Sequence, residues 1–332
     1  MGNRDYGREY LERLGKTLRY FRQQKGFSQR QLVELGAEFG ICSDKHYSRI
    51  ENGNSDTTLT GLNAILLALG INWDELARQM YGVEYTKFQN VITEIWNLFF
   101  MGKDEAAAAR FEELKLQDYY DKDKPVFAQG LLMCDSIVRG KANGYSEETL
   151  NALYNALEIT CPSALHKTPK PSLNVDFVKE KVFSLNEYRI LSAICEIKTD
   201  LTEINEAISI LLAIHKSLKR HDVGIETRRS QLPIIYYRLT RAKLIEAVRA
   251  MDYEEVLFFC DEGIKFCKAE GAYKILGHLY CNSGSAYCEL GNRKKAEEYF
   301  EMSCKTFSSH GDVETAECLK KLVAEEHNIK LE

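Results

Sequence analysis

The sequence is poor in proline and modest in glycine, with 5 Pro and 21 Gly among 332 residues. Turn-rich β folds use more of both, so this composition favours an all-α chain. The ten cysteines include no Cys-x-x-Cys pair. Disulfide scaffolds and zinc ribbons need closely paired cysteines or a secreted context, so both are disfavoured. We therefore predict reduced thiols, no metal and no other cofactor.

Long apolar runs are also missing. The longest, such as AILLALGI and AISILLAI, are far shorter than the roughly 18 residues that a membrane span needs. The opening MGNRDYGREY is charged and lacks an apolar core, so no secretory signal is expected. With 45% apolar residues the chain can bury sizeable cores, and its length favours two domains. We expect a cytoplasmic protein with no membrane partner.

Charged residues are distributed unevenly along the chain. The formal net charge is -5, yet residues 13–55 contain eight basic and four acidic side chains. Charge acts locally, and a basic segment is suited to nucleic acid. The remainder of the chain is acidic, which indicates two parts with different tasks.

Short helices are predicted over residues 14–76. Apolar residues recur at helical spacing ahead of Gly26, a left-handed cap position. Ser28 is an N-cap candidate for the next helix, in which Leu32 and Leu35 face inward. The segments DKHYSRIEN, TTLTGLNAILLALG and NWDELA complete five short helices in about sixty residues. The second and third helices, joined by a tight connector, have the pattern of a helix-turn-helix module.

The stretch LRYFRQQKGFSQRQLVEL, the block SRIENG and the tail LGINWDEL resemble the Xre/Cro-type helix-turn-helix domain, in order and nearly in spacing. One difference is that Leu32 to Gly53 carries about four more residues than the usual pattern, which lengthens the second helix or its turn. The resemblance implies a structural ion pair between Arg22 and Glu51 that ties the first helix to the third.

A recognition helix presents its first turn, and one position a turn further on, to the major groove. In this chain these residues are Asp44, Lys45, His46 and Arg49, preceded by the N-cap candidate Ser43. Lys45 and Arg49 can donate to guanine O6 and N7, whereas Asp44 can accept from cytosine N4 but repels nearby phosphate. Phosphate contacts position a protein without reading sequence. The residues suited to them are Arg19, Gln29, Arg30 and Asn52.

Beyond residue 81 the helices lengthen and repeat. The segment LYCNSGSAYCELGNRKKAEEYFEMSCKTF places small and aromatic residues at tetratricopeptide spacing. Equivalent pairs recur farther back, so we predict a right-handed superhelix of about five degenerate helical hairpins, capped by DVETAECLKKLVAEEHN. From last to first, these pairs are Ala296 and Phe300, Val256 and Cys260, Ala207 and Leu211, and Ala107 and Phe111. A further hairpin is predicted from GYSEETLNALYNALEI, with Ser146 as its N-cap candidate, and the helix Phe127–Val138 before it.

The first helix of each stacked hairpin lines the concave face of such a superhelix. Carrying the spacing of the last repeat backward gives inward polar residues suited to an extended peptide. Asn can bond both main-chain groups of a peptide, and Arg can bind a carboxylate bidentately. The predicted peptide-binding residues are Arg189, Ser192, Glu196, Arg238, Arg241, His278, Asn282 and Ser285. For each of them, solvation or pairing with a helix neighbour is an equally open interpretation.

The sequence therefore predicts a domain resembling the Xre type at residues 1–80 and tetratricopeptide-like hairpins at residues 81–332. It resembles the peptide-pheromone receptors of Gram-positive bacteria, the RRNPP group with its Rgg, PlcR and PrgX types. That resemblance implies a homodimer whose repeat domain binds a short signalling peptide, as in quorum sensing. The peptide then controls how two helix-turn-helix domains bind a double-stranded DNA operator.

Three alternatives stay open. The repeats can be controlled by a protein partner, such as an antirepressor or phage factor, instead of a peptide. The helix-turn-helix fold can serve protein contact alone. The chain can also be an enzyme of the phosphatase-type repeat class, but it contains no phosphate loop, nucleophile elbow or paired carboxylate site. We therefore predict no catalytic residues.

Overall fold

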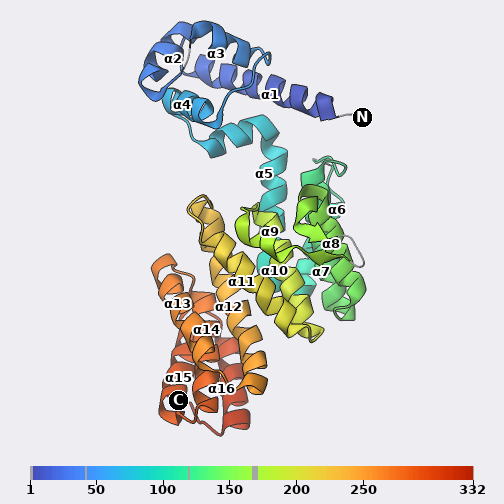
Figure 1. Cartoon of the computed structure of the whole chain (residues 1–332), viewed down its shortest axis with the longest axis vertical. Helices are drawn as coiled ribbons and strands as arrows, with labels where there is room; N and C mark the ends of the chain where they lie inside the picture. Colours follow the sequence, from blue (N-terminus) through green and yellow to red (C-terminus); the bar gives the residue numbers. More distant parts are fainter. Residues whose placement is uncertain (1–2, 42, 119, 167–170, 332) are drawn as a thin grey trace. The chain divides into compact units, whose positions relative to one another are not determined.

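The computed structural model describes residues 3–41, 43–118, 120–166 and 171–331 (Figure 1). Their regular secondary structure is almost entirely helical, which confirms the all-α class. Their β structure is one short antiparallel pair, β1 (Leu165–His166) and β2 (Ser172–Leu173). The chain forms two compact units, residues 1–101 with 112–121 and residues 102–111 with 122–332. The boundary predicted between residues 80 and 81 lies within one helix, so a functional division there remains a prediction.

The N-terminal unit contains α1 (Asn3–Gln24), α2 (Gln29–Gly36), the 3-10 turn η1 (Ala37–Phe39), α3 (Asp44–Glu51), α4 (Leu59–Leu69) and α5 (Trp73–Phe100). The fifth helix was predicted to be short, and that was wrong, because α5 has 28 residues. Its apolar residues continue at helical spacing, with Phe88, Ile92 and Ile95 fully buried. Burial of this continuing face stabilises the longer helix.

Ser28 caps α2 as predicted. Its Oγ accepts from the backbone N–H of Gln31 at 3.2 Å, and the Gln31 side chain accepts in return from the N–H of Ser28 at 2.8 Å. The prediction that Leu35 faces inward was wrong, because it is 47% exposed. Ile41 folds directly over Gly36, so closely that a Cβ on Gly36 would overlap its side chain. Ile41 therefore fills the inward position next to α2.

The extra residues between the second and third helices form η1. Gly40 ends this turn with φ 90, a backbone region that favours glycine. Ser43 then precedes α3, but its side chain makes no capping hydrogen bond. The core holds α3 in place through Tyr47 and Ile50, which are 1% and 2% exposed.

The two helices α1 and α3 pack closely at Gly15. A Cβ at this position would lie 2.5 Å from the carbonyl oxygens of both Ile50 and Glu51. Only glycine permits this contact without a shift of backbone. The end of α3 is therefore fixed against α1.

The C-terminal unit is a series of helical pairs joined by short turns. The pairs are α7 (Pro125–Asn143) with α8 (Glu147–Thr160), α10 (Leu185–Asp200) with α11 (Ile204–Leu218), α12 (Ile225–Ala250) with α13 (Glu254–Glu270), and α14 (Tyr273–Glu289) with α15 (Arg293–Ser309). Helix α6 (Asp104–Lys115) precedes them and α16 (Val313–His327) closes the series. Two segments that the sequence did not predict, η2 (Pro162–Ala164) and α9 (Val175–Glu180), lie between α8 and α10.

Packing follows the predicted repeat. The first helices of successive pairs, α7, α10, α12 and α14, contact one another in order (Figure 1). The eight residues at the repeat positions are all buried, each at most 1% exposed. In the last pair a Cβ on Gly284 would lie 2.7 Å from the Phe300 ring, so a small residue faces an aromatic one. Among the described ranges, no helix is long and apolar enough to cross a membrane.

Candidate nucleic-acid interface and ligand-binding face

Glu51, the last residue of α3, has a fully buried carboxylate that joins three helices. It accepts hydrogen bonds from Arg22 Nε at 2.6 Å, Arg22 Nη2 at 3.1 Å and Gln29 Nε2 at 2.7 Å. Burial opposes ionisation, but the hydrogen bonds from Arg22 and Gln29 outweigh it and hold the pKa of Glu51 below its usual value. The ion pair between Arg22 and Glu51 implied by the resemblance is present, and it links α1 and α2 to α3.

The residues predicted to contact phosphate all have side-chain partners within the protein. Arg19 donates to Asn52 Oδ1 at 2.5 Å and to the Glu51 carbonyl at 3.3 Å. Asn52 donates to the Ser48 carbonyl at 2.8 Å, and Arg30 Nε donates to Glu34 at 2.9 Å. With Gln29 bound to Glu51, all four side chains are oriented by contacts within the protein, and groups ordered in advance lose less entropy when a ligand binds.

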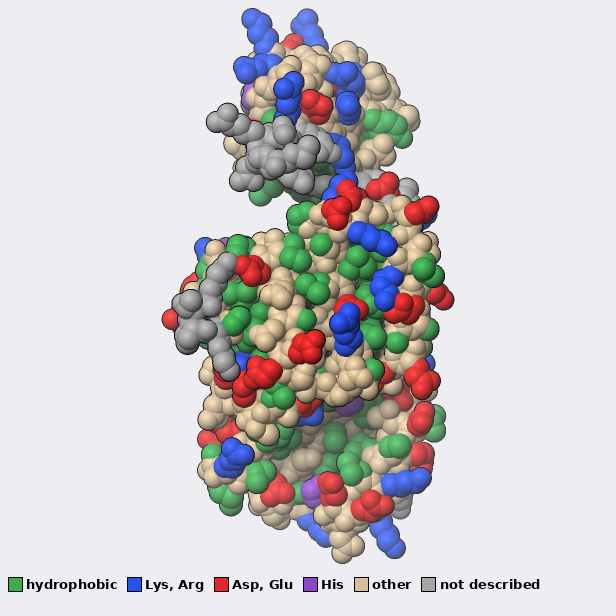
Figure 2. Space-filling view, turned by 90° about the vertical axis from the view of Figure 1, so that its right-hand side faces the viewer, with side chains coloured by type: hydrophobic (Ala, Val, Ile, Leu, Met, Phe, Trp, Pro, Cys, Tyr) green, Lys and Arg blue, Asp and Glu red, His purple; other side chains and the backbone are tan. Residues whose placement is uncertain are grey.

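The residues predicted to contact bases differ from this set. Asp44, Lys45 and Arg49 are exposed and His46 is half-buried, all on α3. Within the described part of the chain, none of these four side chains forms a hydrogen bond or ion pair. Figure 2 shows Lys and Arg side chains gathered at one end of the N-terminal unit. The structure thus separates oriented polar groups from four open ones on the exposed side of α3.

In the C-terminal unit, charged residues from three first helices form one network. Arg238 on α12 donates to Glu196 on α10, and also to Ser192 Oγ at 2.6 Å. Lys141 on α7 lies 3.9 Å from Glu196. Burial opposes ionisation of Glu196, but Arg238 and Lys141 outweigh it and lower its pKa. The network ties α7, α10 and α12 together.

Arg241 and Asn282 extend this face toward α14. Arg241 Nη2 lies 3.4 Å from Asp200 Oδ1, and Asn282 donates to Thr240 Oγ1 at 2.8 Å. His278 lies between two aromatic rings, with centroids 4.8 Å from Tyr237 and 5.0 Å from Phe307. Ser285 is half-buried on α14, one turn beyond Asn282.

Three of the predicted peptide-binding residues are buried, with Arg238 at 9% exposed. Arg189 is 2% exposed and Ser192 is fully buried. Burial lowers the pKa of Arg189 to about 10, so it remains cationic at neutral pH. Arg189 donates to Asn186 Oδ1 at 3.3 Å, while Ser192 holds Arg238. In this structure both can affect a ligand only through their neighbours.

The sequence did not single out three further residues of this face, Lys141, Tyr237 and Thr240. Tyr237 and Thr240 are close in sequence to Arg238 and Arg241, so the helical phase could have located them. Lys141 could not be found that way, because its role depends on the approach of α7 to α10. Figure 2 shows a hollow lined by hydrophobic side chains where the C-terminal helices lie.

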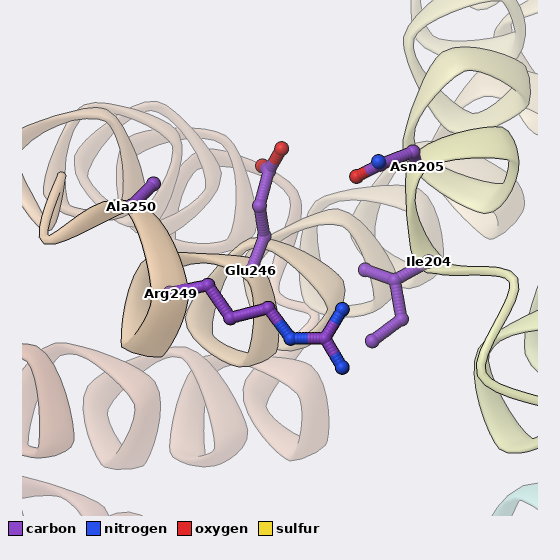
Figure 3. A pocket seen from close by; sticks show the side chains of 5 residues that line it. All are labelled: Ile204, Asn205, Glu246, Arg249 and Ala250. Atoms are coloured by element: carbon purple, nitrogen blue, oxygen red, sulfur yellow. The ribbon is translucent and has the colours of Figure 1, made fainter.

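Two of the cavities in the described part of this unit lie elsewhere. One, of about 240 Å³, is lined by Ile204, Asn205, Glu246, Arg249 and Ala250 at the ends of α11 and α12 (Figure 3). The other, of about 390 Å³, lies between α7 and α8 and includes Asp135, Arg139 and Asn143. Neither includes a residue predicted to bind a peptide, so the predicted face and these cavities are separate features.

Comparison with known proteins gives a match for the first of these sites. Residues 18–76 match the family model of helix-turn-helix domains. This range contains α2 and α3, the connecting turn and the Glu51 network. No curated protein sequence gave a significant match. Residues 18–76 are thus a helix-turn-helix domain.

Solved structures match nearly the whole chain. Bacillus thuringiensis PlcR in complex with the peptide PapR7 and DNA has 18% identity and a TM-score of 0.68, covering 93% of this chain and 99% of PlcR. The Streptococcus dysgalactiae SHP pheromone receptor Rgg2 has 15% identity and a TM-score of 0.57, covering 94% and 99%. A putative transcriptional regulator from Listeria monocytogenes has 15% identity and a TM-score of 0.51, covering 96% and 100%. The chain shares its fold with these proteins.

Proposed function

We propose that this chain is a cytoplasmic, homodimeric transcription regulator. Its helix-turn-helix domain binds operator DNA, and its repeat domain binds a short linear peptide that controls this binding. The DNA part of the proposal rests on the difference between two sets of polar side chains in the N-terminal unit. Four side chains on α3 are open, while the flanking polar groups are already oriented around Glu51. A helix held in this way suits the major groove, where open donors and acceptors meet base edges.

DNA binding is tested by fluorescence polarisation with duplexes taken from upstream of the protein's own gene. Arg49→Ala removes an exposed guanidinium of α3 and should weaken binding on the order of 10-fold, within the range for one good base contact. Lys265→Ala is the control, because it removes one exposed positive charge from α13 in the other unit. Equal affinity of Arg49→Ala and the parent chain would count against the assignment.

The peptide part rests on the face built from α10, α12 and α14, and on the fold shared with PlcR and Rgg2. Asn282, Arg241 and the ring of His278 provide polar and aromatic groups along first helices, where a peptide main chain can lie. Pools of labelled short synthetic peptides provide the probe. Asn282→Ala should weaken the binding of these peptides, whereas Asn205→Ala, in the separate cavity, should leave it unchanged. If no pool binds, the peptide part of the proposal fails.

The dimer is proposed because a two-fold operator presents half-sites about 34 Å apart, which one domain cannot span. Light scattering coupled to size-exclusion chromatography measures the mass of the chain with and without duplex. A single protomer under both conditions would overturn this part. A peptide can shift the regulator only as far as it binds one arrangement better than the other.

A further inference from the structure

The open side chains of α3 carry both signs of charge. Lys45 and Arg49 are one helical turn apart and lie on one side of the helix. Asp44, the first residue of α3, is exposed on the adjoining side. Its carboxylate makes no hydrogen bond within the described part of the chain, and Ser43 rather than Asp44 occupies the cap position. A free carboxylate at the start of a DNA-facing helix needs an explanation, because phosphates repel it.

Arg30, in the first turn of α2, supplies part of that explanation. Its guanidinium is bound to Glu34 through Nε at 2.9 Å, and it also interacts electrostatically with Asp44. A positive charge from the neighbouring helix, itself paired with Glu34, therefore offsets part of the charge of Asp44. The same arginine remains 80% exposed and can contact a phosphate itself.

The chemistry of a carboxylate limits which base it can read. An ionised Asp is an acceptor only. In the major groove cytosine offers the N4 donor, whereas guanine offers only acceptors. Adenine has an N6 donor, but its N7 acceptor lies beside that donor and repels a carboxylate. Thymine O4 is an acceptor as well.

We propose that Asp44 is a specificity-determining residue that accepts a hydrogen bond from cytosine N4. The half-site then contains G·C pairs, with guanines contacted by Lys45 and Arg49 and a cytosine contacted by Asp44. This inference rests on the proposed DNA binding and adds the base composition of the operator.

The test is selection of duplexes from a randomised pool by the full-length chain. The parent chain should enrich a cytosine at one half-site position. Asp44→Asn exchanges the carboxylate for an amide, which pairs with adenine N6 and N7, so that position should change from cytosine to adenine with roughly a 10-fold change in relative affinity. Glu38→Gln is the matched control, an exposed carboxylate on η1, and should select the same duplexes as the parent.

Asp44→Ala provides a second readout. It should lose the preference at that position and bind random duplex more tightly, because a negative charge next to phosphates is gone. An Asp44→Asn pool with the same base as the parent pool would overturn the inference while leaving DNA binding intact. A parent chain that enriches no duplex would overturn the proposed DNA binding, and this inference with it.

Discussion

The buried carboxylate of Glu51 is the most informative place to perturb the N-terminal unit. Glu51→Gln keeps the size of the side chain and removes its charge, leaving Arg22 without its carboxylate. Arg22 is only 12% exposed, so water does little to replace the lost partner. Removing one member of a buried pair costs roughly 3–5 kcal/mol. Arg22 keeps its hydrogen bond to the Phe27 carbonyl at 2.6 Å, so we expect the free energy of unfolding to fall by about 3 kcal/mol, the low end of that range.

Tryptophan fluorescence in urea measures this loss, because both tryptophans, Trp73 and Trp96, belong to the N-terminal unit. With a slope of about 1.5 kcal/mol per M, the unfolding midpoint should fall by about 2 M. The matched control is Glu34→Gln, which breaks the exposed pair with Arg30 and should leave the midpoint unchanged. A Glu51→Gln midpoint equal to that of the control would refute the reasoning.

Acid provides an independent check on Glu51. Its pKa is lower in the folded chain than the ordinary value of 4.5, so the unfolded chain takes up the proton first. The stability from this carboxylate is therefore complete above pH 4.5 and is lost as pH falls through the folded pKa. Glu51→Gln should show a weaker dependence of the unfolding midpoint on pH in that window than the parent chain does.

Three further predictions concern both units. Burial lowers the pKa of His215 from 6.5 to about 4, so the C-terminal unit should lose stability as pH falls between these values. The loss is at most about 1.4 kcal/mol per pH unit, and hydrogen exchange in α11 should show a flatter profile for His215→Leu. Gly15→Ala should lower the free energy of unfolding by roughly 1–3 kcal/mol, despite alanine's better helix propensity, and so lower the urea midpoint. Lys16→Ala should leave the midpoint unchanged. Glu196→Gln leaves Arg238, which is 9% exposed, without its carboxylate. The free energy of opening of α10 and α12 should fall by about 3 kcal/mol, so their amide hydrogens should exchange faster. Unchanged exchange would contradict the role of the network.

Much of the fold could be predicted because the signals are local. Cap residues, left-handed glycines and helical spacing identify α2, α3 and α4, and the small and aromatic positions of the last pair locate the repeat. The length of α5 and the exposure of Leu35 could not be predicted in this way. The exposure of Leu35 follows from Ile41, only five residues beyond Gly36, taking the inward position, and the length of α5 depends on how far the packed core buries its continuing apolar face.

In the candidate sites, too, local sequence signals predicted some features and tertiary contacts decided others. The sequence alone placed the open residues of α3 on one short helix, because side-chain direction on a helix follows from spacing. It also located the polar residues of the first helices in the repeats. Only the tertiary structure decided which of these are held and which are open. Gln29, Arg19 and Asn52 are held around Glu51, and Arg189 and Ser192 are buried, because segments 22 or more residues apart in the sequence meet only in the folded chain.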